Sequence, residues 1–212
     1  FTLLVDIGQA SLATDSATLY NGSWDAGSNN GSGFTSWSFN YSGGFGNSGQ
    51  YIKDDSRWAL WANNFGTVEA TRQFDALNVG DALTLDLQHT SNIDTGSEVG
   101  LTLSKDGSAV FNLKFVGGQS NWEAWDPNRG NYSLSQGYAS DTSLNFSYTR
   151  FGDFEYSLDF GSHSAAINFA GVSMAGINQV TFYNNRQGSG QNYSIGDMAV
   201  IPEPATIGLL GF

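Results

Sequence analysis

The stretch FEYSLDF, residues 154–160, decides the fold class of this chain. Its aromatic and aliphatic side chains occupy every second position, and its polar side chains occupy the positions between them. Successive side chains of a β-strand point to opposite faces, so an extended backbone gives this stretch one apolar and one polar face. It therefore predicts a strand of an antiparallel sheet that is packed on one side only.

The same two-residue period recurs along the chain, and it is clear in residues 83–88, 111–115 and 144–149. The dipeptide Asp106-Gly107 separates two such stretches and is a strong signal for a tight hairpin turn. Other breaks are rich in Gly and Asn, and no stretch keeps a helical period of 3.6 residues. We predict an all-β protein: one antiparallel two-sheet β-sandwich of jelly-roll type over residues 1–200, without significant helix, followed by a tail over residues 201–212.

The composition restricts the partners. The 212 residues include 20 Asp plus Glu against 8 Lys plus Arg, which gives a formal net charge of −12. Nucleic acids and anionic membranes are disfavoured, because both bind through basic side chains. The chain has no cysteine, which excludes disulfides, thiol nucleophiles and thiolate metal sites. An acidic surface that is poor in lysine suits divalent cations or neutral sugars.

The last residues form the tail IPEPATIGLLGF, in which Pro202, Glu203 and Pro204 precede an apolar run. This tail resembles the start of the PEP-CTERM sorting signal of Gram-negative bacteria. The resemblance implies processing by an exosortase system, contact with the membrane only before the tail is cut, and export to the cell surface or the extracellular matrix. The apolar run is far shorter than the roughly 20 residues of a membrane span, and the basic cluster of the family is missing. The chain also opens on FTLLVDIG without a Met, which we interpret as a mature N-terminus after export.

The body of the chain resembles the lectin-like sandwich modules of secreted bacterial proteins. The resemblance rests on LLVDIG at the start, WALWAN, IDTGSEVGLTL, FVGGQSNW and the closing YNNRQGSGQNYSIGDMAV. It implies a fold and an extracellular location, and it carries no catalytic motif.

The sequence shows no convincing catalytic pattern. Ser173 lies in GVSMA, which lacks the closing glycine of a hydrolase elbow, and only His89 and His163 are available as bases. Asp153 and Glu155 are two positions apart, so they are expected to share a solvated strand face and not to flank a sugar cleft. We therefore predict that the protein is not an enzyme.

Two arrangements of oxygen ligands predict a structural calcium ion. Asn92, Asp94 and Glu98 occur in a short loop at alternating positions, and calcium takes 6–8 hard oxygen ligands. The second candidate pairs Asp6 on the first strand with Asp197 near the last, since similar carbohydrate-binding modules hold calcium there. The alternatives are an ordinary Asx turn and a solvated strand carboxylate.

The best candidate for glycan binding is the segment from Asn121 to Arg129, which we interpret as a loop. Trp122 and Trp125 would stack on the apolar faces of sugar rings, and the hydroxyls would bind Asn121, Asp126 and Arg129. The alternative is that both tryptophans close one end of the sandwich.

Three functions stay open on these observations. The first is a secreted, non-enzymatic protein of the cell surface or biofilm matrix that binds a glycan or extracellular polysaccharide. The second is a structural subunit of an extracellular filament or surface layer, a homopolymer in which the apolar N-terminal strand or the tail completes a neighbour's sheet. The third is a glycoside hydrolase, which rests only on the fold.

Overall fold

The computed structural model describes residues 11–43, 46–89, 92–168, 171–188 and 191–202. Within these ranges the chain forms strands and one 3-10 helix, η1 (Ala17–Tyr20). No helix in the described part of the chain has the length and apolar character needed to span a membrane. The strands are β1 (Ala13–Asp15), β2 (Ser38–Ser42), β3 (Ser48–Lys53), β4 (Arg57–Ala62), β5 (Gly66–Gln73), β6 (Ala82–His89), β7 (Glu98–Lys105), β8 (Ser108–Val116), β9 (Asn121–Asp126), β10 (Gly130–Gly137), β11 (Leu144–Arg150), β12 (Glu155–Phe160), β13 (His163–Asn168), β14 (Gln179–Gln187), β15 (Gln191–Ile195) and β16 (Met198–Ile201).

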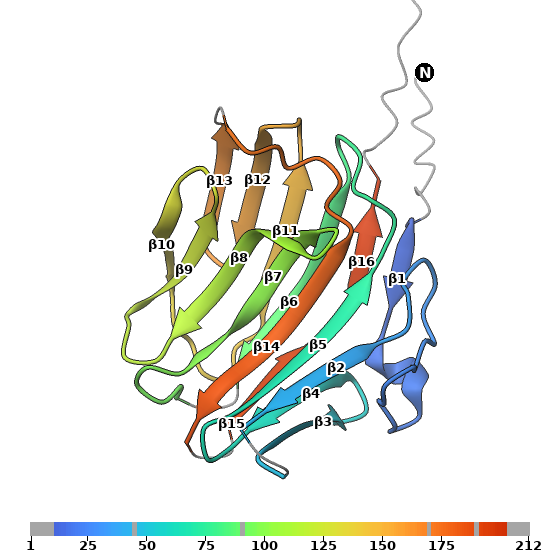
Figure 1. Ribbon diagram of the computed structural model, residues 1–212, viewed down its shortest axis with the longest axis vertical. Coiled ribbons are helices and arrows are strands. Elements are labelled where there is room, and N and C mark those ends of the chain that lie inside the picture. Colours follow the sequence, from blue (N-terminus) through green and yellow to red (C-terminus); the bar gives the residue numbers. More distant parts are fainter. Residues whose placement is uncertain (1–10, 44–45, 90–91, 169–170, 189–190, 203–212) are drawn as a thin grey trace, which may run out of the picture.

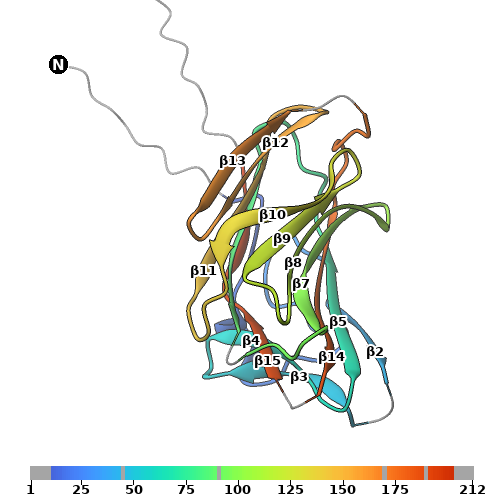
Figure 2. The same ribbon diagram turned by 90° about the vertical axis from the view of Figure 1, so that its left-hand side faces the viewer.

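The strands pair into two antiparallel sheets that face each other, as Figures 1 and 2 show. The seven-stranded sheet has the order β10-β9-β8-β7-β14-β5-β2 and lies in front in Figure 1. The nine-stranded sheet has the order β13-β12-β11-β6-β15-β4-β3, with β16 paired to β6 and β1 paired to β16. The prediction of an all-β, two-sheet sandwich without significant helix is confirmed.

Period-two alternation produces this architecture directly. In β6, buried and half-buried side chains alternate without a break, and its buried residues are Leu83, Leu85, Leu87 and His89. In β12 the buried residues are Tyr156, Leu158 and Phe160, as FEYSLDF predicted. Phe154 departs from the pattern, because it lies in a bend before the strand and is 41% exposed. The core between the sheets is rich in aromatic rings, among them Trp37, Trp58, Phe111 and Phe182.

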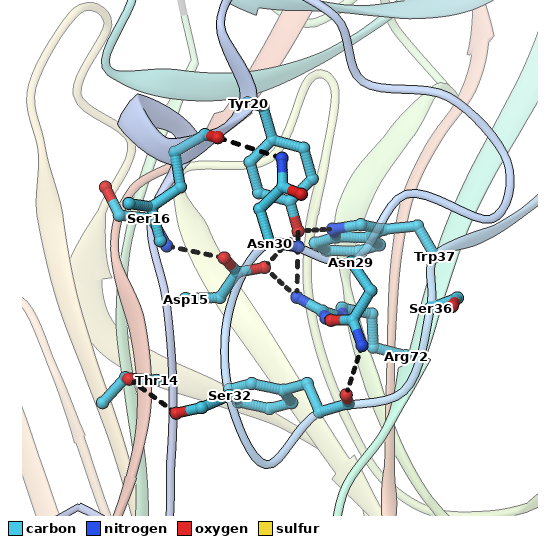
Figure 3. Close-up of polar contacts among 12 residues, drawn as sticks. Thr14, Asp15, Ser16, Tyr20, Asn29, Asn30, Ser32, Ser36, Trp37 and Arg72 are labelled. Carbon is cyan, nitrogen blue, oxygen red and sulfur yellow. Dashed lines mark hydrogen bonds and ion pairs between the residues drawn. The ribbon is translucent and has the colours of Figure 1, made fainter.

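A buried ion pair joins the two sheets near the first strand (Figure 3). Arg72 on β5 donates to the carboxylate of Asp15 on β1, and both side chains are fully buried. The Asp15 carboxylate also accepts a hydrogen bond of 2.6 Å from Tyr20 Oη, which in turn accepts one from Trp37 Nε1. Burial lowers the pKa of Arg72 to about 10, which leaves the guanidinium charged at neutral pH. The pair therefore attaches β1 of one sheet to β5 of the other.

Candidate functional site

The outer face of the seven-stranded sheet, called the polar face from here on, carries ordered rows of polar side chains. Cross-strand partners in a sheet point to the same side, so the register gives the composition of each row. The first row crosses all seven strands as Ser38, Thr71, Thr181, Thr102, Asn112, Trp125 and Asn131. Six of these seven side chains are hydroxyls or amides, and the seventh is a half-buried tryptophan.

Two further rows run beside the first. The second is Asn40, Glu69, Tyr183, Gly100, Lys114, Glu123 and Ser133. The third crosses five strands as Ser42, Thr67, Asn185, Glu98 and Val116. The face thus combines hydroxyl, amide and carboxylate groups with the half-buried ring of Trp125, which is the chemistry that sugars require of a binding surface.

Hydrogen bonds fix many of these groups in place. Asn112 Nδ2 donates to Tyr183 Oη at 3.0 Å and to Thr102 Oγ1 at 2.9 Å. Lys114 Nζ lies 3.1 Å from a carboxylate oxygen of Glu98. These contacts orient the central side chains of the face before any ligand arrives, which reduces the entropy cost of binding.

Gly100 makes room for Tyr183 at the centre of the face. A Cβ atom on Gly100 would lie 2.8 Å from Tyr183 Oη and 2.1 Å from the carbonyl oxygen of Leu113. Tyr183 is consequently 6% exposed, and burial raises the pKa of its hydroxyl well above the usual range. Tyr183 is therefore a neutral phenol at physiological pH.

A β-bulge at Arg186 interrupts the polar face at the end of β14. Asn185 pairs with Thr67 and the next pair is Gln187 with Gly66, so Arg186 is the additional residue. Its φ angle is +63°, a conformation that costs a non-glycine residue about 1–3 kcal/mol. The bulge leaves Arg186 exposed beside Asn185, whereas strict alternation would have turned it toward the core.

A hollow lies at this bulge. It has a volume of about 300 Å³ and is lined by Thr67, Gly96, Glu98, Asn185 and Arg186; it is called the Arg186 hollow below. A larger hollow of about 610 Å³ lies on the nine-stranded sheet, with Asp86, Asp159 and Asp197 in its lining. The Asp86 carboxylate there already accepts from Arg57 and Ser143.

The predicted glycan segment is a strand and not a loop, which separates its residues. Asn121, Glu123 and Trp125 of β9 are half-buried, whereas Trp122, Ala124 and Asp126 are buried. Trp122 is 3% exposed and packs on Phe160 with 4.9 Å between ring centroids. The prediction that Trp122 stacks on a sugar is therefore wrong, and the pattern NWEAWD already contained the alternation that explains it.

Asp126 and Arg129 also have structural contacts. Asp126 has no exposed surface, accepts from the backbone amides of Asn128 and Arg129 at 2.9 Å each, and accepts from Tyr156 Oη at 3.0 Å. The prediction that Asp126 binds a sugar hydroxyl is wrong, because its carboxylate is used inside the protein. Arg129 stacks on the ring of Tyr132 at 3.5 Å and pairs with Asp126. Trp125 and Asn121 remain on the polar face.

Of the described residues predicted to bind calcium, two have contacts within the protein and two are exposed. The Asp94 carboxylate accepts from the backbone amide of Gly188 at 2.6 Å, and Glu98 points to Lys114. Asn92 and Asp197 are exposed, and Asp6 lies outside the described residues. Within the described ranges no three His, Cys, Asp or Glu side chains gather as a metal site would require. A structural calcium ion stays a prediction.

Of the tail, Pro202 is described, whereas Glu203 and Pro204 lie outside the described residues.

The residues weighed for catalysis do not meet on the polar face. Both carboxylates belong to the nine-stranded sheet or its loops. Asp153 precedes β12 and pairs with Arg150, and Glu155 on β12 accepts from the side-chain amide of Asn168 on the neighbouring β13. His89 Nδ1 lies 3.0 Å from Tyr138 Oη, and His163 Nδ1 lies 3.0 Å from Ser135 Oγ.

The fold has solved counterparts, although no family model and no curated protein matches this chain. An alginate lyase of polysaccharide lyase family 7, AlgAT5, is 11% identical with a TM-score of 0.55, over 73% of this chain and 82% of that one. A structure from work on endo-acting O-glycanases of the human gut microbiota that initiate mucin breakdown is 8% identical with a TM-score of 0.58, over 94% and 96%. The cellulose induced protein Cip1 is 8% identical with a TM-score of 0.56, over 77% and 90%.

These likenesses establish the fold, and they correct one prediction. The chain was expected not to be an enzyme because it carries no catalytic motif. Alginate lyases are enzymes, and those of polysaccharide lyase family 7 share this sandwich at TM-scores of 0.52 to 0.55. The expectation of a non-enzymatic protein is therefore withdrawn, because enzymes use this fold and a missing linear motif says little where reacting groups come from several strands of a sheet.

Proposed function

We propose that the polar face binds a polysaccharide. The observation that carries this proposal is the first row, in which hydroxyl and amide side chains from six strands share the face with Trp125 on the seventh. Six spacings of about 4.8 Å make the row roughly 29 Å long, which suits a chain of sugars better than a single one. The names of the proteins that share the fold, an alginate lyase and mucin O-glycanases among them, support the same class of ligand.

The proposal includes processing of the bound chain. Lys114 pairs with Glu98, and Glu123 is the cross-strand partner of Lys114 in the second row, so an amino group and two carboxyl groups lie in neighbouring positions of the face. Acid–base cleavage of a glycan needs groups of these types close together. The test of binding therefore also measures release of new chain ends.

Binding is tested by affinity electrophoresis against a panel of neutral and acidic polysaccharides, followed by calorimetry and an assay for new reducing ends. Trp125→Ala is expected to weaken binding at least tenfold, about 1.4 kcal/mol. Tyr51→Ala is the matched control, because Tyr51 is a 37% exposed aromatic residue on β3 of the other sheet. Equal affinities of the two variants, or no binding of the native protein to any polymer, would refute the proposal.

We further infer an extracellular location from the resemblance of residues 201–212 to the PEP-CTERM signal. This inference is supported by the sequence PEPAT, residues 202–206, which directly follows the last strand, β16. Intact mass spectrometry of the protein from its producer tests this inference. A mass that ends within the tail supports processing at the signal, and recovery of the protein only inside the cell contradicts it.

A further inference from the structure

The arginines of the described chain differ in how their charge is neutralised. Arg57, Arg72, Arg129 and Arg150 each form an ion pair with an aspartate. Among the described contacts, Arg186 has no side-chain hydrogen bond and no ion pair. In a chain with a net charge of −12, an arginine without a carboxylate partner is unusual. Its guanidinium is therefore available to an external anion.

The backbone that presents Arg186 is unfavourable for an arginine. At φ +63° a glycine would fit without strain, yet the chain has arginine at the bulge. The bulge also directs the side chain outward to the Arg186 hollow. Strained residues at bulges are concentrated at binding sites, where the surrounding structure holds them in place.

A second group in the hollow lacks a partner. The Oδ1 atom of Asn185 is buried and accepts no hydrogen bond from the protein. A buried acceptor without a partner is destabilising by about the free energy of its lost hydration, so a rotation of the Asn185 side chain that brings Oδ1 to a ligand hydroxyl would be favoured. Asn185 is the cross-strand partner of both Thr67 and Glu98, so it stands in the middle of the hollow.

The charge of Glu98 does not cancel that of Arg186. The Glu98 carboxylate lies 3.1 Å from Lys114 Nζ, on the side of β8 and away from β14. The charges of that pair offset each other, so among the residues that line the hollow Arg186 is the charged side chain without an ion pair.

We propose that the Arg186 hollow is an anion subsite that takes an acidic sugar residue. Arg186 binds its carboxylate or sulfate, and Asn185 Oδ1 accepts from one of its hydroxyls. A carboxylate suits the planar guanidinium through two parallel hydrogen bonds. This inference rests on the proposed polysaccharide function and makes it specific, because it predicts acidic chains over the neutral sugars that the net charge suggests.

The test compares polygalacturonate with its methyl ester, which has the same backbone without the charges, and with dextran sulfate. Calorimetry at low salt is expected to show the native protein binding polygalacturonate at least tenfold more tightly than the ester. Arg186→Gln is expected to remove this preference and leave binding of the ester unchanged. A preference for dextran sulfate that Arg186→Gln removes would assign the anion as a sulfate.

Two further variants keep the result interpretable. Lys105→Gln removes the same charge at the opposite end of β7, where the side chain is exposed, and should keep the preference. Arg186→Gly fits φ +63° and should raise Tm while abolishing the preference, which separates loss of binding from loss of folding. An unchanged preference in Arg186→Gln and Arg186→Gly overturns the subsite but not the polysaccharide face. No binding of these three polymers, when another polymer of the panel binds, overturns the subsite alone, and no binding of any polymer overturns both.

Discussion

Arg72 and Asp15 form an ion pair between two sheets, with both side chains fully withdrawn from water. Arg72 belongs to β5 of the seven-stranded sheet, and Asp15 ends β1, which reaches the nine-stranded sheet only through β16. Arg72 also donates to the carbonyl oxygen of Thr35 at 2.7 Å and lies over the rings of Phe34 and Trp37. The pair thus holds the loop before β2 and the first strand against the sandwich (Figure 3).

Removing one partner of this pair should be costly. Asp15→Asn leaves the guanidinium of Arg72 buried without its counter-charge, and we expect the free energy of unfolding to fall by about 3–5 kcal/mol. Urea denaturation followed by tryptophan fluorescence measures this change. Combining Asp15→Asn with Arg72→Met should cost less than the sum of the two single changes, because the second removes the unpaired charge. Strict additivity would show that the pair is not coupled.

The two tryptophans of β9 should respond in opposite ways. Trp122→Ala creates a cavity in the core and is expected to destabilise the protein by about 3–5 kcal/mol. Trp125→Ala removes a side chain from the polar face and should change the free energy of unfolding by about 1 kcal/mol or less. Thermal unfolding of both variants gives the comparison. Similar losses of stability would contradict the assignment of the two side chains to opposite faces.

Gly100 should tolerate no side chain. In Gly100→Ala the added methyl group meets the carbonyl oxygen of Leu113 and the hydroxyl of Tyr183, and we expect a loss of about 1–3 kcal/mol together with displacement of Tyr183. The control is Gly137→Ala on β10 of the same sheet, where the nearest atom to the new Cβ lies at 3.7 Å. Chemical denaturation of the two variants decides the matter, since an equal response would mean that the space over Gly100 can adapt.

Alkaline pH should weaken the fold through its buried phenols. Burial raises the pKa of Tyr138 from 10.0 to about 12, so the unfolded chain loses this proton before the folded protein does. The contribution to stability is complete below pH 10 and is lost as the pH rises toward 12. Urea denaturation between pH 9 and pH 11 should show a falling free energy of unfolding, with a smaller slope in Tyr138→Phe. A slope that Tyr138→Phe leaves unchanged would assign the effect to other groups.

The sequence by itself determined the strands and the class of fold. The alternation in FEYSLDF and in β6 is a property of neighbouring residues, and it appears unchanged in the burial of Tyr156, Leu158 and Leu85. The same rule would have placed Trp122 and Trp125 on opposite faces, had the segment been interpreted as a strand.

Only the tertiary structure decided which strands lie side by side. The polar face exists because β14, near the end of the chain, lies between β5 and β7, so that Thr181 joins Thr71 and Thr102 in one row. The Arg186 hollow likewise needs the bulge in β14 beside Thr67 and Glu98. These contacts join residues more than 70 positions apart, and their register depends on the packing of the whole sandwich, which no local pattern of side chains encodes.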